Sequence, residues 1–202
     1  MKTALAQGRA TLALALFHTD YKDLQVQTAI LPGVIDISNA AEATIRGAEL
    51  EGTVRVTPRA LDAGGHLAWL DARYDRYVAV GVGGVTGDAA AHRLNNAPEW
   101  SGRLWIEGRR QLGRGTLSLR ADGRWQSTVF YTPFNDAIQR QRPYGLLDLS
   151  ASLDTGRWSA GVYARNATDT GYITGTFSSP PPAIGGRPGD SRQIGVQFTV
   201  RK

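Results

Sequence analysis

Cysteine is absent from the 202-residue chain, and lysine occurs only at positions 2, 22 and 202. Without cysteine the protein can have neither a disulfide scaffold nor a thiolate metal site. No stretch approaches the roughly 18 to 20 uninterrupted apolar residues that a membrane-spanning helix requires. The lack of cysteine therefore excludes a disulfide-rich protein, and the lack of a long apolar run excludes a protein with membrane-spanning helices.

The formal net charge is +5, but the positive charge is not gathered in one place. Arginines are spread along the chain and often stand beside carboxylates, as in Asp71–Arg73–Asp75. No run of five or more basic residues exists, so we predict no nucleic-acid partner.

The N-terminal stretch MKTALAQGRATLALALF has the basic start and apolar content of a secretory signal peptide. Its apolar part is interrupted by Gln7, Gly8 and Arg9, and no small-residue cleavage site follows Phe17. We therefore expect no signal peptide, and we expect a long strand beginning at Arg9.

Apolar and polar residues alternate with a period of two, which is typical of strands with one apolar and one polar face. Between Leu117 and Gln126, for example, Leu119 and Ala121 alternate with Arg120 and Asp122. Gly, Asn, Pro and Asp separate the alternating segments. Eight segments follow this pattern: 9–28, 35–57, 63–79, 98–112, 115–132, 144–154, 157–170 and 191–201. The chain is predicted to be all-β and antiparallel.

The connections between these segments alternate in length. Three are tight (TPRALDAG, LGRG and DTGR), whereas AILPGV and the stretches after segments three, five and seven are longer and looser. Short turns at one rim and long loops at the other are typical of an outer-membrane β-barrel, in which lipid requires a closed ring of hydrogen bonds. Two alternatives remain open: a soluble β-sandwich that binds carbohydrate through aromatic loops, and a small closed eight-stranded barrel.

Five segments, in order, carry a resemblance to one family. They are FHTDYKDLQVQT (17–28), NAAEATIRGAELEG (39–52), LNNAPEWSGRL (94–104), ARNATDTGY (164–172) and GDSRQIGVQFTVRK (189–202). With them the chain resembles the C-terminal β-barrel part of TonB-dependent outer-membrane receptors of the siderophore type.

The resemblance implies a location in the bacterial outer membrane and a share in the uptake of a ferric siderophore or similar nutrient. The eight segments would be the last eight strands of a 22-stranded barrel, with the tight turns periplasmic and the long connections extracellular. The implied partners are outer-membrane lipid, the outer-membrane assembly machinery, the ferric chelate and TonB. Neither a cofactor nor an enzymatic activity is implied.

The chain also departs from the family pattern. The plug domain and the TonB-contacting box of the family have no counterpart in residues 1–202. Ser191 replaces a usual proline, and the closing strand ends in Arg201–Lys202 rather than in an aromatic residue. We therefore expect residues 1–202 to be a partial barrel domain that does not transport by itself and that meets TonB only through a missing N-terminal region.

Candidate ligand contacts lie in the long connections, where arginines would attract an anionic ferric chelate. These are His92, Arg93, Phe134, Arg140, Arg142, Phe177 and Arg187. A separate structural motif consists of Asn166, Asp169 and Tyr172, since short polar side chains can hold backbone groups where a strand bends.

Other residue groups carry no predicted site. His18, His66 and His92 fall in different segments without metal-ligand spacing. Glu49 and Glu51 share a strand face, as any residues two apart do. GVGGVTG (81–87) lacks the spacing of a phosphate-binding loop and is predicted to be a flexible loop. No catalytic or metal site is predicted.

Overall fold

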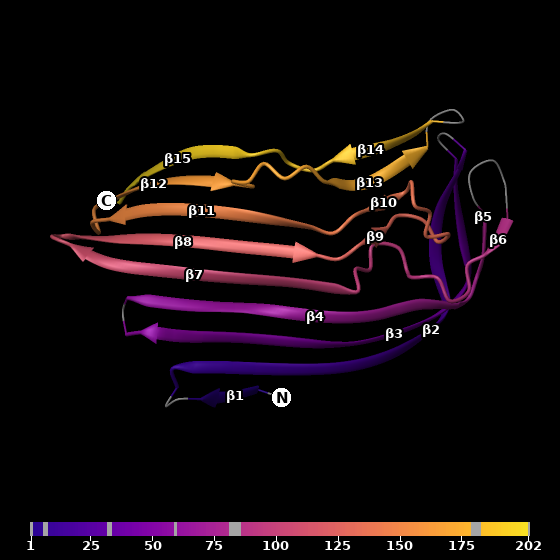
Figure 1. The fold of residues 1–202 in the computed structure, drawn as a ribbon, viewed down its shortest axis with the longest axis horizontal. Helices are drawn as coiled ribbons and strands as arrows, with labels where there is room; N and C mark the ends of the chain where they lie inside the picture. The colour runs from indigo at the N-terminus through magenta and orange to yellow at the C-terminus, as the bar shows by residue number, and fades with distance from the viewer. Residues whose placement is uncertain are drawn as a thin grey trace.

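The computed structural model describes residues 2–5, 8–31, 34–58, 60–80, 86–178 and 183–201. In these residues there are fifteen strands and no helix, and hence no helix that could cross a membrane. Nine strands form one sheet in the order β1-β2-β3-β4-β7-β8-β11-β12-β15, with all neighbours antiparallel (Figure 1). The all-β antiparallel prediction is confirmed.

The main sheet consists of β1 (Lys2–Leu5), β2 (Ala10–Leu31), β3 (Val34–Thr57), β4 (Leu61–Arg76), β7 (Trp100–Leu112), β8 (Gly115–Gln126), β11 (Tyr144–Asp154), β12 (Trp158–Arg165) and β15 (Gln193–Val200). Three small hairpins lie in the long connections. They are β5 (Val78–Val80) with β6 (Thr86–Asp88), β9 (Val129–Phe130) with β10 (Arg140–Gln141), and β13 (Ile173–Ser178) with β14 (Ile184–Pro188).

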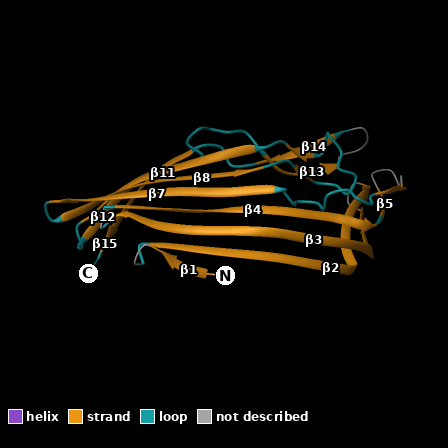
Figure 2. Ribbon diagram, turned by 60° about the horizontal axis from the view of Figure 1, so that its bottom comes forward, coloured by secondary structure: helices purple, strands orange, loops and turns teal. Residues whose placement is uncertain are grey.

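The sheet is curved, as the wall of a barrel is (Figure 2). Its short turns lie at one end, on the left in Figure 1, and the small hairpins lie at the other end. We call these the turn end and the loop end. Within the described chain, β1 and β15 are the two edges of the sheet and are not paired with each other, so the barrel is open. This arrangement corrects both alternatives, the two-layered sandwich and the small closed barrel.

Glycines with a left-handed backbone make the tight turns possible. Gly113 joins β7 to β8 at φ 57°, and Gly156 joins β11 to β12 at φ 83°. Few other residues adopt this conformation at low cost. Strands β7 and β8 consequently pair in unbroken register, from Leu112 opposite Gly115 to Ser101 opposite Gln126.

The sequence reading missed one strand of the main sheet. Lys2–Leu5 forms β1 and pairs with β2 between Ala10 and Ala13. Gly8, at φ 81°, lies in the turn between them. Polar residues and glycine interrupt the apolar pattern, as the sequence analysis noted. The interruption marks the hairpin turn between β1 and β2, and not the start of the first strand.

The first long connection was also predicted wrongly. AILPGV is not a loose loop, because β2 continues to Leu31 and β3 begins at Val34; residues 32 and 33 lie outside the described residues. Register shifts follow Tyr21 and Leu24, and Asp23 adopts φ 56° there. These irregularities let the pair continue past the rest of the sheet at the loop end (Figure 1).

Several predicted segments are longer than the strands of the main sheet. The segments 63–79, 115–132 and 157–170 leave it after Arg76, Gln126 and Arg165. The three small hairpins were not predicted. Alternation of residue type continues past each strand end, so the period of two alone cannot locate the point where the chain turns away.

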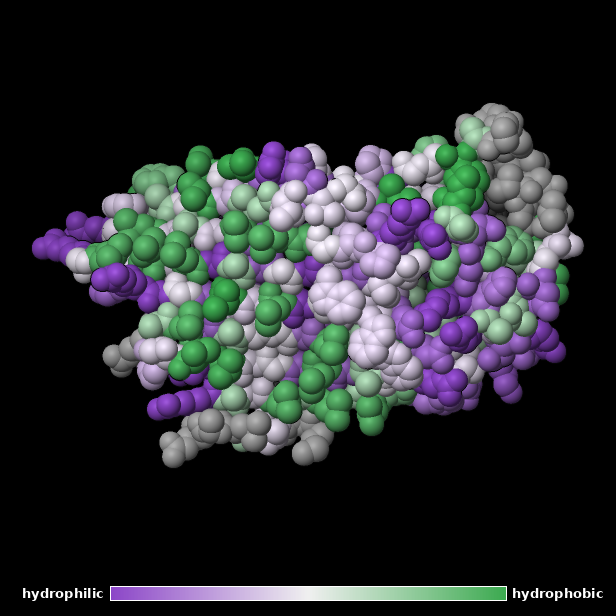
Figure 3. Space-filling model, viewed as in Figure 1, coloured by the Kyte–Doolittle hydropathy of each residue, from purple (hydrophilic) through white to green (hydrophobic). Residues whose placement is uncertain are grey.

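The apolar side chains of the sheet are mostly not in a core. Leu104 is 71% exposed and Val196 is 82% exposed, whereas the buried cluster lies at the loop end. That cluster consists of Val26, Ala41, Tyr74, Tyr77, Ala79 and Ala89. Hydrophobic residues cover the left and centre of the face seen in Figure 3, and hydrophilic residues prevail toward the loop end. A large exposed apolar surface of this kind indicates contact with a non-aqueous environment.

Candidate functional site

The face opposite the apolar one, here called the polar face, carries a network of ion pairs. Arg103 donates two hydrogen bonds to Asp122, at 2.7 and 2.6 Å. Arg120 contacts both Asp122 and Glu107 at 3.1 Å, and its guanidinium carbon lies 4.4 Å from the centre of the Trp105 ring. Diagonal neighbours on one face of an antiparallel sheet are within reach of such long side chains.

The network extends to both sides of this centre. Arg109 contacts Asp62 at 2.7 Å, and Arg55 lies 3.7 Å from the same carboxylate. On the other side Arg124 contacts Asp148 at 3.3 Å. The polar face is therefore crosslinked by paired charges from β3 to β11. Among the described residues, no group of three or more His, Asp or Glu side chains is arranged to hold a metal ion.

At the loop end the long connections form one assembly, here called the loop cap (77–80, 86–99, 127–143, 166–178 and 183–192). Tyr131 donates a hydrogen bond from its hydroxyl to the carbonyl of Ile173 at 2.7 Å. The Ile173 amide in turn donates to the side chain of Gln141 at 2.7 Å. Burial, and then the nearby Tyr144, raises the pKa of Tyr131, so its hydroxyl stays protonated, and a donor, further into the alkaline range.

Three of the predicted ligand residues come together inside the loop cap. His92 Nδ1 lies 2.9 Å from the carbonyl oxygen of Pro133, and Arg93 contacts Glu99 at 2.6 Å. Phe134 packs against the buried cluster. The structure thus places all three in contacts within the protein.

Asn135 is a residue of this junction that the sequence reading missed. It accepts a hydrogen bond from the Arg93 amide at 2.8 Å and donates to the Arg93 carbonyl at 3.0 Å. Its backbone has φ 54°, a conformation that asparagine tolerates better than most residues. An asparagine between Phe134 and Asp136 was the available signal.

The other four predicted ligand residues lie on different parts of the loop cap. Arg140 belongs to β10, and its Nε is buried without a hydrogen-bond partner in the described structure. Arg142 is exposed. Phe177 on β13 is 52% exposed, and Arg187 on β14 is exposed. Arg142, Phe177 and Arg187 are accordingly accessible from solvent.

The corner after β12 is built around Asn166, which is 3% exposed and has φ 44°. Its side chain donates to the carbonyls of Thr170 and Asp190, both at 3.0 Å, and accepts from the Thr170 amide at 2.9 Å. The Asn166 amide donates to Asp148 at 2.8 Å. Asn166 therefore connects the corner with the segment that returns to β15 through its side chain, and with β11 through its backbone amide.

Asp169 and Tyr172 hold the returning segment as well. Asp169, at φ 55°, accepts a hydrogen bond from the Arg192 amide at 2.9 Å. The Tyr172 ring stacks on Tyr144 at a centroid distance of 4.7 Å, and its hydroxyl accepts from the Asp190 amide at 3.3 Å. These contacts fix the entry of the chain into β15.

A curved antiparallel sheet with an exposed apolar face, a charged opposite face and long connections at one end is the wall of a membrane β-barrel. The sequence matches the family described as "TonB dependent receptor-like, beta-barrel" over residues 2–167, and the chain belongs to this family. It is therefore a bacterial outer-membrane protein of a receptor family and not an enzyme. In the usual orientation of such barrels, the long connections are extracellular and the short turns are periplasmic.

Solved structures of siderophore receptors share the fold. The ferric yersiniabactin uptake receptor FyuA from Yersinia pestis has a TM-score of 0.78 and 22% identity, over 95% of this chain and 27% of that one. The siderophore receptor PiuA from Acinetobacter baumannii has a TM-score of 0.72 and 18% identity, over 98% and 26%. The ferric-catecholate import receptor Fiu from E. coli K12 has a TM-score of 0.68 and 20% identity, over 98% and 26%. The chain thus spans about a quarter of the length of these receptors.

Proposed function

We propose that this chain is part of the barrel wall of a receptor that takes up a ferric siderophore or a similar nutrient with energy delivered through TonB. The observation that carries the proposal is the division of one curved sheet into an apolar and an ion-paired face, in a chain of this family. The apolar face would meet outer-membrane lipid, and the polar face would line the lumen.

The exposed part of the loop cap supplies the ligand contacts in this proposal. Arg142 and Arg187 offer positive charge to an anionic ferric chelate, and Phe177 offers an aromatic surface. His92, Arg93 and Phe134, which were predicted as contacts, would act on the ligand only by shaping the loop cap, because their side chains are used within the protein.

Transport would belong to the complete receptor. The plug and the contact with TonB would come from regions other than residues 1–202, and the chain would reach the membrane through the outer-membrane assembly machinery. Residues 1–202 would form the wall and the extracellular cap, and would not couple transport to the energy delivered through TonB.

Uptake by the complete gene product tests the proposal. The gene would be expressed in an E. coli strain that lacks its own siderophore receptors, and radioactive iron uptake would be measured for a panel of ferric hydroxamates, catecholates and carboxylates. We expect uptake of at least one chelate, its loss in a strain without TonB, and its reduction by Arg142→Ala with Arg187→Ala. Correct surface expression without uptake of any chelate, or uptake that does not need TonB, would contradict the proposal.

A further inference from the structure

Two glutamines of one long connection are buried. Among the described residues, four polar or charged residues are buried, and two of these are Gln139 and Gln141, each 8% exposed. The other two are Asp122, which belongs to the ion-pair network, and Asn166, which forms the corner after β12. Burying an amide side chain costs free energy unless new hydrogen bonds replace those to water. The two glutamines therefore mark a junction with specific hydrogen bonds.

Side chains, and not a backbone ladder, join the hairpin β9–β10 to the hairpin β13–β14. The side-chain oxygen of Gln141 accepts a hydrogen bond from the Ile173 amide at 2.7 Å, and the Tyr131 hydroxyl donates to the Ile173 carbonyl at 2.7 Å. Ile173 lies opposite Pro188 in its own hairpin, and proline has no backbone N–H to donate. Both backbone groups of Ile173 are thus bound by the other hairpin.

The same glutamine also holds the next residue, Arg142. Nε2 of Gln141 donates a hydrogen bond to the Arg142 carbonyl at 2.7 Å. Pro143 follows, and a residue before proline is restricted to extended conformations. Arg142 itself is exposed. Its backbone is therefore fixed, whereas its side chain is accessible to a ligand.

A second contact lies on the other side of Arg142. Tyr144 stacks on Tyr172 at a centroid distance of 4.7 Å, and Tyr172 directly precedes Ile173. Arg142 thus stands between two contacts, at positions 141 and 144, that both reach positions 172 and 173.

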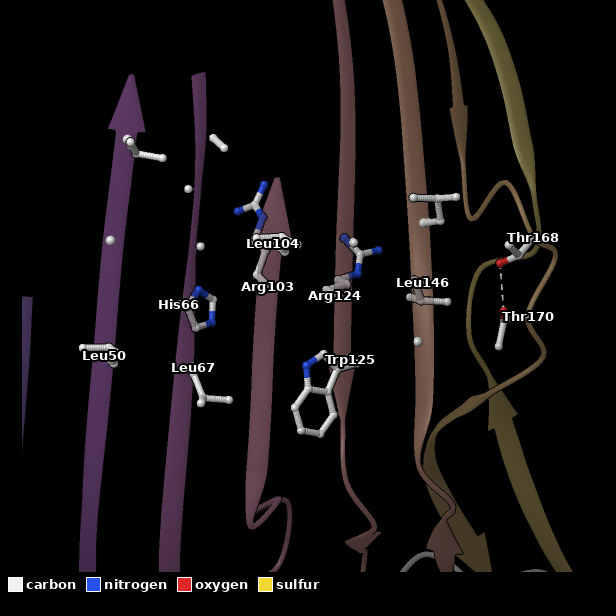
Figure 4. A pocket seen from close by; sticks show the side chains of 18 of the residues that line it. Leu50, His66, Leu67, Arg103, Leu104, Arg124, Trp125, Leu146, Thr168 and Thr170 are labelled. Atoms are coloured by element: carbon white, nitrogen blue, oxygen red, sulfur yellow. Dashed lines mark hydrogen bonds between the residues drawn. The ribbon is translucent and has the colours of Figure 1, made fainter. Parts of the chain in front are cut away.

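The chain reaches this stack from the corner after β12, which is bound to β11. The Ala167 amide donates a hydrogen bond to the Leu147 carbonyl at 2.7 Å. Figure 4 shows Thr168 and Thr170 of this corner, whose hydroxyls lie 3.0 Å apart, next to the strand that carries Leu146. The approach to β13 is therefore anchored on β11 as well as on β10.

The other two exposed ligand residues are placed from the same anchor. Arg187 lies opposite Gly175, which follows Ile173 by two residues. Two residues along a strand and one strand across correspond to a distance of about 8 Å from Ile173. Phe177 lies on β13, two residues beyond Gly175. Ile173 is thus a common reference point for the exposed ligand residues of both hairpins.

We propose that Gln141 is a positioning residue of the ligand surface, which fixes Arg142 relative to Phe177 and Arg187. The inference rests on the proposed function. Gln141 does not touch the chelate and acts through Arg142, because one amide side chain binds both the Arg142 carbonyl and the Ile173 amide. Cations that are held at a set spacing before binding lose less conformational entropy when an anionic chelate arrives.

A double-mutant cycle separates positioning from stability. The complete receptor would be purified in mild detergent, and Kd would be measured for anionic iron(III) citrate, anionic iron(III) enterobactin and cationic iron(III) desferrioxamine B. The cycle uses the anionic complex that binds more tightly and combines Gln141→Met with Arg142→Ala. Methionine fills nearly the volume of glutamine and makes none of its hydrogen bonds.

Gln139→Met is the matched control. Gln139 has the same exposure as Gln141, and its Nε2 donates to Oγ1 of Thr176 at 3.3 Å, and not to Arg142. Heat-dependent gel mobility would establish that each variant is folded. If Gln141→Met does not fold, Gln141→Asn takes its place, since it keeps the amide but is one methylene too short to reach both partners.

We expect Gln141→Met to weaken binding about fivefold when Arg142 is present, and less than about twofold in Arg142→Ala. Gln139→Met should change the affinity by the same factor in both backgrounds. The urea midpoint should fall by the same amount in both backgrounds for either glutamine variant, because the lost hydrogen bonds do not involve the Arg142 side chain.

Three results would overturn the positioning role and leave the proposed function in place. They are an unchanged affinity in Gln141→Met, an equal loss of affinity with and without the Arg142 side chain, and binding of the cationic complex alone. A folded natural receptor that binds none of the three complexes would contradict the proposed function itself, and the positioning role with it.

Discussion

The side-chain amide of Asn166 donates a hydrogen bond to the backbone carbonyl of Asp190, which follows 24 residues later, at 3.0 Å. Asn166 stands where the chain leaves β12, and Asp190 stands just before it enters β15. The contact therefore closes the base of the last long connection. We therefore expect substitutions in the hairpin β13–β14, above this base, to leave the pairing of β12 with β15 unchanged.

Replacing Asn166 by alanine is expected to reduce the free energy of unfolding by about 3 kcal/mol. The change removes three side-chain hydrogen bonds from a buried position and puts alanine at a positive φ. Asn166→Gly should cost about 1 kcal/mol less, because only the hydrogen bonds are lost. The measurement is the urea midpoint of the folded barrel. An effect no larger than that of the exposed control Thr168→Ala would show that the corner is not needed for stability.

Asp122 is the centre of the network on the polar face, so its removal should leave Arg103 and Arg120 without their shared carboxylate. We expect Asp122→Ala to lower the free energy of unfolding by about 2 kcal/mol. The loss is smaller than for breaking a fully buried ion pair, because the Arg103 side chain is half exposed to screening solvent. The double variant Arg103→Met with Asp122→Leu should lose less than Asp122→Ala alone. An equal or larger loss in the double variant would show that packing, and not charge pairing, decides the stability of this face.

Substitutions in the loop cap should distinguish residues that maintain its structure from residues that contact the ligand. Asn135→Ala removes two hydrogen bonds to the Arg93 backbone and should expose the loop cap to faster hydrogen exchange. Arg142→Ala should leave exchange unchanged and weaken binding of an anionic ferric chelate about tenfold. Unchanged exchange in Asn135→Ala would contradict a stabilising contact between these connections. Unchanged chelate binding in Arg142→Ala would show that Arg142 does not contact the ligand.

The loop cap should weaken in alkaline solution through Tyr131. Burial raises the pKa of this hydroxyl in the folded state, so its contribution to stability is full below the unfolded value of about 10 and is lost as the pH rises above it. Hydrogen exchange of 127–143, corrected for its intrinsic pH dependence, should increase between pH 9 and 11 in the natural protein. Tyr131→Phe should abolish that increase; a parallel increase in Tyr131→Phe would assign the effect to another group.

Much of the barrel wall could be predicted from the sequence, because each strand face meets only one environment. The alternation of Leu119 and Ala121 with Arg120 and Asp122 distinguishes the apolar face of the sheet from the polar face. Glycines such as Gly113 indicate the tight turns. The strand 144–154 was predicted with its observed bounds. Local pattern is sufficient where side-chain direction has a fixed period.

The loop cap could not be predicted in the same way, because its contacts join residues far apart in the chain. The pairs Arg93–Asn135 and Tyr131–Ile173 are each separated by 42 residues. Hairpins as short as β9–β10 leave no periodic signal, and a loop arginine looks the same whether it faces solvent or, like Arg93, a carboxylate. Strand β1 was missed because four residues are too few to establish a period.

The absence of cysteine makes the central claim directly measurable. Single cysteines at Leu104 and Leu119 on the apolar face, and at Arg103 and Ser118 on the polar face, would be labelled in outer-membrane vesicles with a small water-soluble maleimide. The account predicts that the first pair stays unlabelled until detergent is added, whereas the second pair reacts in the intact membrane. Equal labelling of both faces without detergent would contradict the assignment of this sheet as a lipid-facing barrel wall.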